Sequence, residues 1–276
     1  MKLALCNEVL AHLPLERQCE LAAALGYDGL EIAPFTLGDA PHRLAASEIA
    51  RVRKTVESFG LAVTGLHWLL VAPPGLSVTD PDARIRTRTR DVVAQLIALC
   101  AELGGNVLVH GSPKQRGIAP GEDHATALAR LRDFLADAAR VAEAHGVVYC
   151  IEPLGRAETA LVNTVAEPAS LVREIGRSSL RTMIDTSAAG ATETQSVPEL
   201  IDEWLPTGVI GHVQVNDPNR RAPGQGAMRF APIFAALQRN GYDRTVAVEP
   251  FDYVPDGAGA AAFAAGYLRG IRESLV

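Results

Sequence analysis

The sequence predicts an α/β fold, a (β/α)8 or TIM barrel in which eight parallel strands close into a ring surrounded by helices. Short apolar runs rich in β-formers alternate strictly with longer segments of helical period, and eight such pairs can be counted. Strict alternation favours parallel strands joined by right-handed crossovers. Dividing 276 residues by eight units gives 276/8 = 34.5 residues per unit, which suits a closed barrel of roughly 250 residues.

Each element can be assigned a residue range from this alternation. Strands are expected over residues 2–6, 29–32, 62–70, 106–110, 147–151, 180–184, 210–215 and 245–248. Helices are expected over residues 15–25, 47–59, 82–103, 124–145, 166–175, 197–204, 230–240 and 259–274. Six of these helices are followed by a glycine, which accepts the left-handed conformation of a helix C-terminus: Gly26, Gly60, Gly104, Gly146, Gly176 and Gly241.

An open, doubly wound sheet is the alternative to a barrel. That fold would place a glycine-rich dinucleotide turn after the first strand, and residues 7–14 contain no glycine. We find no linker, low-complexity segment or repeat beyond the strand-helix period. The sequence therefore predicts one barrel domain spanning residues 1–276.

The composition argues against several classes of protein. The net charge of −6 gives no basic stripe for binding nucleic acid, and no apolar stretch reaches the roughly 20 residues that cross a membrane. The four cysteines lie far apart without a CxxC pair, so neither a zinc knuckle nor a redox dithiol is indicated. We expect a reduced, cytoplasmic setting.

Four acceptor side chains close consecutive apolar runs in the second half of the chain. They are Glu152 in YCIEP, Asp185 in TMIDTS, Gln214 in HVQVND and Glu249 in VAVEP, spaced by about one strand-helix unit. Because active sites of such barrels lie at the C-terminal ends of the strands, these side chains are expected to converge. A single acidic residue there would more often form a salt bridge, but four in succession favour a functional site.

Three carboxylates and an amide on one rim would repel one another and lose hydration unless a cation held them. An all-oxygen set favours Mn²⁺, with Mg²⁺ or Co²⁺ as alternatives, over Zn²⁺. His212 shares a strand face with Gln214, so either residue could be the third ligand. Gln214 lies closer to the C-terminal rim, at the level of the other three.

The motifs around these residues resemble a known family. IEPLGRAET (151–159), IDTS (184–187), GHVQVNDPNRRAPGQG (211–226) and VEPFDY (248–253) are similar to segments of the xylose-isomerase-like sugar isomerases and epimerases, in the branch of the D-tagatose 3-epimerases and hydroxypyruvate isomerases. The resemblance extends over nearly the whole chain. It implies metal ligation by Glu152, Asp185, Gln214 and Glu249. It also implies that Glu152 and Glu249 exchange a proton with an α-hydroxy carbonyl through a metal-stabilised enediolate.

The same resemblance suggests substrate contacts at Arg220 and Glu158, for which solvated surface residues are the alternative. His67 and Asn7 end the third and first strands and are candidate substrate contacts, although core or rim packing would also explain them. The family often has a histidine three residues after the metal aspartate, where this chain has Ala188. This departure, and the HxQ form at His212 and Gln214, leave the substrate open.

Alternative functions remain at this point. A lyase that dehydrates a keto-polyol would use the same four residues. A phosphodiesterase of the abasic-site endonuclease type would need a histidine-rich cluster and a basic surface. Ser112, Lys114 and Arg116 could meet a phosphate, but no glycine-rich cradle leads into a helix there. A binding protein without catalysis is the last alternative. The expected partners are a small carbohydrate or keto-acid and further copies of the chain, as a dimer or tetramer.

Overall fold

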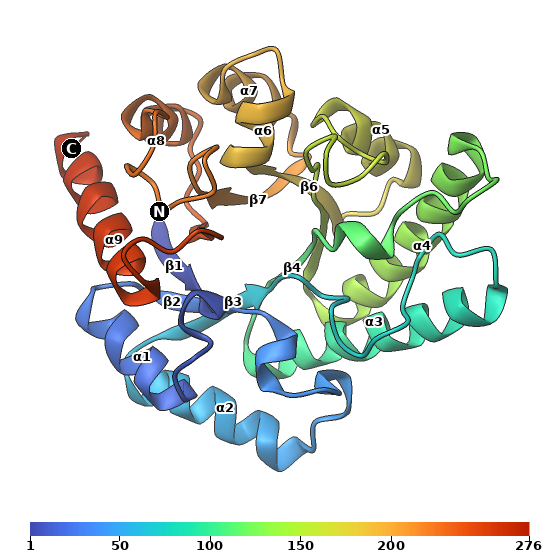
Figure 1. Cartoon of the computed structure of the whole chain (residues 1–276), viewed down its shortest axis with the longest axis horizontal. Helices are drawn as coiled ribbons and strands as arrows, with labels where there is room; N and C mark the ends of the chain where they lie inside the picture. The colour runs from blue at the N-terminus through green and yellow to red at the C-terminus, as the bar shows by residue number, and fades with distance from the viewer. Residues whose placement is uncertain (276) are drawn as a thin grey trace.

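The computed structural model describes residues 1–275 and shows a closed barrel of eight parallel strands in sequence order, in which β1 pairs with β8. In Figure 1 the strands lie at the centre and the helices form a ring around them. The strands are β1 (Lys2–Cys6), β2 (Gly29–Ile32), β3 (Ala62–Leu66), β4 (Val107–His110), β5 (Val148–Ile151), β6 (Leu180–Asp185), β7 (Ile210–Val215) and β8 (Thr245–Val248). The predicted fold class is confirmed.

The α-helices fill the connections between the strands. They are α1 (Leu15–Ala24), α2 (Ala46–Ser58), α3 (Ala83–Leu103), α4 (His124–His145), α5 (Ala166–Ile175), α6 (Thr186–Thr192), α7 (Val197–Trp204), α8 (Phe230–Arg239) and α9 (Gly257–Ser274). Aspartates begin several of them: the carboxylates of Asp82, Asp123 and Asp256 each accept a hydrogen bond from a backbone N–H of the first turn. Most bounds lie within two residues of those expected from the sequence.

Two segments differ from the sequence-based expectation. The third strand ends at Leu66 rather than residue 70, because the chain turns out of the sheet there and Trp68 adopts a left-handed φ of 53°. The short helix α6 was not expected at all. It consists of small residues and follows Asp185 directly, so it has no apolar period that would predict a helix.

The apolar core lies between the strands and the surrounding helices, and polar side chains occupy the middle of the barrel. Glu31, His67, His212 and Gln214 are all buried there. The strand register pairs Asp185 of β6 with Gln214 of β7, so these two residues stand at one level. The fold therefore places polar groups in a continuous column below the C-terminal rim.

The N-terminal end of the barrel contains a hollow of about 470 Å³, which is lined by residues such as Lys2, Asn106, Arg181 and Arg244. Of the residues considered for the site, only His212, the alternative third ligand, lines it. Because chemistry in these barrels occurs at the opposite, C-terminal end of the strands, we place the candidate site there. Among the helices of residues 1–275, none has both the length and the apolar character needed to cross a bilayer.

Candidate active site

Three of the predicted carboxylates meet at the C-terminal rim. Glu152 follows β5, Asp185 ends β6 and Glu249 follows β8, and one carboxylate oxygen from each lies within 4.8 Å of the others. All three residues are buried. Like charges this close in a buried site favour protonation, unless a cation balances them.

The pKa values of these groups reflect the crowding. Burial and the negative charge of Asp185 raise the pKa of Glu152 well above its usual range. Burial and the charge of Glu152 do the same for the pKa of Glu249. Burial raises the pKa of Asp185 to about 7, although this carboxylate also accepts a hydrogen bond of 2.7 Å from the backbone N–H of Ala188. The three groups therefore need protons or a positive charge between them.

Gln214 stands in register with Asp185 and offers an amide oxygen at that level of the barrel. Its side-chain nitrogen donates a hydrogen bond of 2.8 Å to Glu31 Oε1, while its oxygen has no hydrogen-bond partner among the described residues. Asp185 Oδ2 also lacks one within residues 1–275. Carboxylate and amide oxygens left without partners are the donor set that a hard divalent cation prefers, so the residues present fit such an ion.

His212, the alternative third ligand, lies deeper in the barrel. Its Nε2 is 2.8 Å from Glu31 Oε2, and it pairs in register with Met183 rather than with Asp185. Burial alone would raise the pKa of Glu31, but the charge of His212 and its contact with the carboxylate outweigh this and lower the pKa. The geometry therefore favours Gln214 over His212 as a ligand.

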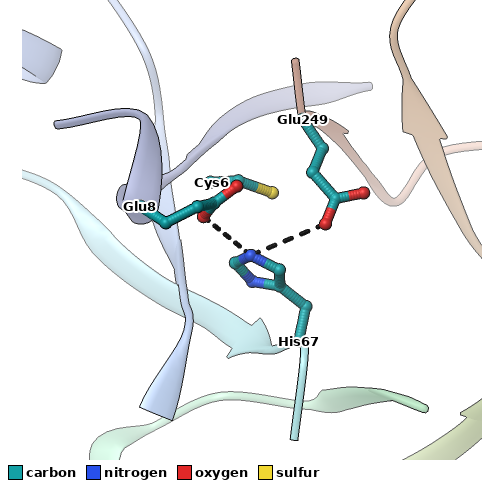
Figure 2. Close-up of side chains that lie close together, drawn as sticks. All are labelled: Cys6, Glu8, His67 and Glu249. Carbon is teal, nitrogen blue, oxygen red and sulfur yellow. Dashed lines mark hydrogen bonds and ion pairs between the residues drawn. The ribbon is translucent and has the colours of Figure 1, made fainter. Parts of the chain in front are cut away.

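His67 lies beside Glu8 and Glu249, as Figure 2 shows. Its Nε2 is 2.7 Å from Glu8 Oε2 and 3.7 Å from Glu249 Oε1, and its Nδ1 is 3.8 Å from Glu31 Oε1. Burial would lower the pKa of His67, but the charge of Glu8 and the hydrogen bond to it raise the pKa instead. The thiol of Cys6 lies in the same cluster.

Arg220 and Glu158 meet at the outer edge of the site. Arg220 Nη1 lies 3.4 Å from Glu158 Oε1, and the guanidinium stands over the ring of Phe251 at 4.5 Å from its centroid. Arg220 has a left-handed φ of 69°, which is costly for a residue with a side chain. Its carbonyl accepts hydrogen bonds of 2.8 Å from the N–H groups of Phe251 and Asp252, which hold this conformation.

Comparison with known proteins gives the identity of the fold. A family model described as xylose isomerase-like TIM barrel matches residues 19–271. The chain belongs to this family. The resemblance predicted from the motifs is therefore confirmed.

Curated relatives within the xylose isomerase-like family are named epimerases and isomerases. A D-psicose 3-epimerase of Ruminiclostridium cellulolyticum is 30% identical over 244 residues, covering 84% of this chain and 76% of that protein. A putative hydroxypyruvate isomerase of Streptomyces coelicolor is 27% identical and covers 90% of this chain and 93% of its own length. The protein is an enzyme of the isomerase and epimerase class. These relatives give no support to the lyase alternative.

Solved structures agree on the fold. The structure of an L-ribulose 3-epimerase superposes with a TM-score of 0.84 at 22% identity, covering 99% of this chain and 95% of that one. A D-psicose 3-epimerase crystallised in the presence of D-fructose gives a TM-score of 0.82 at 22% identity, covering 98% and 99% of the two chains. At this identity the likeness shows the shared barrel.

Asn7, a predicted substrate contact, is engaged elsewhere in the fold. Its side-chain nitrogen donates to Gln18 Oε1 at 3.1 Å and to Thr36 Oγ1 at 2.9 Å, and its oxygen accepts from the N–H of Ala33 at 2.8 Å. Both amide hydrogens are thus used within the protein. We therefore leave Asn7 out of the proposed site, and its neighbour Glu8 stands at the rim instead.

The loop after β4 does not form the phosphate cradle considered from the sequence. Ser112 Oγ accepts from the N–H of Leu70 at 3.1 Å, and Lys114 is exposed. Arg116 is fully buried, and its Nε and Nη2 have no hydrogen-bond partner in the described part of the chain. Burial lowers the pKa of Arg116 to about 10 against the opposing charge of Glu152, so its guanidinium stays cationic and partly balances that carboxylate.

Sequence reasoning did not single out the buried residues Glu8 and Glu31, and it named Arg116 only as a possible phosphate contact, not as a buried cation. One signal was available for Glu31, because a carboxylate in the middle of the apolar strand GLEI is costly unless it is paired. Glu8 is the second residue after β1. It lies in the 3₁₀ turn η1 (Asn7–Leu10), which directs its side chain into the barrel. Nothing in the local pattern predicts that turn.

Proposed function

We propose that this protein is a divalent-cation-dependent sugar or hydroxy-keto acid epimerase or isomerase. The observation that carries the proposal is the meeting of Glu152, Asp185 and Glu249 on three strand ends, buried and with raised pKa values. Relatives named D-psicose 3-epimerase and hydroxypyruvate isomerase support a small ketose or keto-acid as the substrate.

Glu152, Asp185, Gln214 and Glu249 would hold the cation. Their oxygen donors favour a hard ion over Zn²⁺, and we propose Mn²⁺ ahead of Mg²⁺ and Co²⁺. When bound, the cation would supply positive charge that stabilises the negative charge developing on the substrate oxygens and would keep the carboxylates ionised at neutral pH, as a base requires. We propose Arg220 and Glu158 as contacts to the substrate from the outer edge of the site.

Glu152 and Glu249 perform the proton transfer in this proposal. One carboxylate removes the proton from the carbon beside the carbonyl, and the other returns a proton to the opposite face or to the neighbouring carbon. Glu152 follows β5 and Glu249 follows β8, so the two approach the site from different sides of the barrel. A substrate held between them is within reach of both.

Proton exchange tests this function directly. The Mn²⁺-loaded protein is incubated in D₂O with ketoses and keto-acids, and NMR follows deuterium at the carbon beside the carbonyl. We expect incorporation together with a new isomer, and a loss of at least ~100-fold in Glu152→Gln and Glu249→Gln. Glu174→Gln, which changes an exposed glutamate of α5, is the matched control. Absence of exchange with every compound, although Mn²⁺ is bound, would refute the proposal.

We also propose the reduced, cytoplasmic setting that the sequence suggests. The four cysteines are free and buried, which agrees with the proposed reduced, cytoplasmic location. We also propose a single-domain subunit that forms a dimer or tetramer, which sedimentation of the purified protein would test.

A further inference from the structure

Glu8 and His67 form a pair of buried charged residues beside Glu249 that the proposed proton transfer does not use. They lie at the C-terminal ends of β1 and β3, and Figure 2 shows their side chains turned toward each other and toward Glu249. Glu8 Oε1 has no hydrogen-bond partner within residues 1–275. A buried carboxylate oxygen without a partner costs roughly 1–3 kcal/mol, so it calls for an explanation.

We propose that the Glu8–His67 pair is a hydroxyl-binding subsite that holds an uncharged part of the substrate beyond the two carbons that exchange the proton. This inference rests on the proposed function. His67 donates through Nε2 to Glu8 Oε2 at 2.7 Å, which fixes the carboxylate. Glu8 Oε1 is then the atom that accepts a hydrogen bond from a substrate hydroxyl.

The position of Glu8 agrees with a binding role. The residue is 6% exposed, compared with 6% for Glu152 and 4% for Glu249, so it is covered to the same degree as the carboxylates proposed to act on the substrate. Its partner His67 has no exposed surface. Glu8 and Glu249 each place a carboxylate oxygen within 4.8 Å of the other, so a ligand that reaches Glu249 also lies close to Glu8.

The charge around the pair determines what can bind there. Glu8, Glu31 and Glu249 all lie within 4 Å of a ring nitrogen of His67, and no arginine or lysine forms an ion pair with these three in the described residues. A phosphate or carboxylate would be repelled, whereas a hydroxyl can donate to the free oxygen. The subsite thus selects an unphosphorylated polyol chain over a short or anionic keto-acid.

A comparison of substrates in the Mn²⁺-loaded protein tests the subsite. Exchange in D₂O is measured with unphosphorylated ketohexoses, with their deoxy analogues at carbons 4, 5 and 6, and with dihydroxyacetone, which has no distal hydroxyls. In Glu8→Gln and Glu8→Ala we expect kcat/KM for the preferred ketohexose to fall at least ~10-fold, mainly through KM. Exchange on dihydroxyacetone should change less than about threefold in the same variants.

The deoxy analogues separate a binding role from a structural one. Wild-type protein should disfavour one deoxy analogue by at least ~10-fold, and Glu8→Ala should lose this discrimination. Glu16→Gln, an exposed glutamate on α1, is the control. Equal losses on ketohexose and dihydroxyacetone would overturn the subsite and indicate a structural or catalytic role, as would a wild-type preference for a 6-phosphate ester.

Failure of the proposed function would look different, because wild-type protein would then exchange no substrate at all. For that case, titration calorimetry of the ketohexose into Mn²⁺-loaded wild type and Glu8→Gln measures the subsite without turnover. Binding that weakens at least ~10-fold in the variant supports the subsite, and unchanged or absent binding overturns it.

Discussion

At the scale of single residues, Glu31 decides which end of the Gln214 amide faces the site. The lowered pKa of Glu31, set by His212 against the effect of burial, keeps this carboxylate ionised. An ionised carboxylate only accepts hydrogen bonds, so the nitrogen of Gln214 must face it. The oxygen of Gln214 is thereby turned toward the level of Asp185, its register partner.

This orientation can be tested through metal affinity. We expect Glu31→Ala to weaken Mn²⁺ binding by about 10–100-fold, as is typical when a residue that orients a ligand is removed. In a Gln214→Ala background the same change should cost less than about threefold, because nothing is left to orient. Mn²⁺ titration followed by EPR measures both effects, and thermal unfolding checks that the variants fold. Equal losses in the two backgrounds would show that Glu31 does not act through Gln214.

The carboxylates that close apolar runs were predictable, whereas the inward turn of Glu8 and the burial of Arg116 were not. Glu152, Asp185 and Glu249 each close an apolar run at a regular spacing, and the structure brings these three together. The inward turn of Glu8 depends on the 3₁₀ turn η1, and the burial of Arg116 depends on how the loop after β4 packs. Such packing arises from contacts between distant segments, which periodicity does not encode.

At the scale of elements, the loop after β4 supports Glu152 by backbone contact. Gly111 directly follows β4, and a Cβ at this position would overlap Glu152 Oε2. The clash involves the far end of a flexible side chain, so the fold can adapt by moving that carboxylate. The glycine is therefore needed for the position of the proposed acid/base group.

Substitution of this glycine should damage activity more than stability. We expect Gly111→Ala to lower kcat/KM in proton exchange by about 10–100-fold, because small displacements of a reacting group are costly. The midpoint of thermal unfolding should shift by only a few degrees. Gly117→Ala, in the same loop with no atom within 4 Å of the added Cβ, is the matched control. Full activity in Gly111→Ala would contradict this role.

The strands and long helices could be predicted from the alternation of strand-like and helix-like segments in the sequence, but α6 could not. Its seven residues are TSAAGAT, and what starts the helix is Asp185, whose Oδ1 accepts from the N–H of Ala188 at 2.7 Å. Asp185 therefore serves two purposes, since one oxygen caps α6 while the other has no hydrogen-bond partner among the described residues and is available to a cation. Because Asp185 was already explained as a functional acid, there was no separate reason to expect it to cap a helix.

At the scale of the whole molecule, the buried carboxylates link stability to pH and to the cation. Burial raises the pKa of Asp185 to about 7 and raises those of Glu152 and Glu249 well above the usual range, so the folded protein holds protons that the unfolded chain has released. When the folded state binds more protons, the free energy of unfolding falls as pH rises. The fall begins near the ordinary carboxyl pKa of about 4 and continues through about 7.

The unfolding midpoint of metal-free protein should therefore fall between about pH 5 and 8, by roughly 2–4 °C for each kcal/mol lost from the free energy of unfolding. Mn²⁺ should restore the midpoint. The gain from Mn²⁺ should be larger at pH 8 than at pH 5.5, because the cation replaces protons that are no longer available. Differential scanning calorimetry of EDTA-treated and Mn²⁺-loaded protein measures this.

Asp185→Asn keeps an acceptor for the α6 cap while removing one titrating group, so it should flatten the pH dependence and reduce the Mn²⁺ gain. A Mn²⁺ gain that is the same at both pH values would show that these carboxylates do not hold the cation.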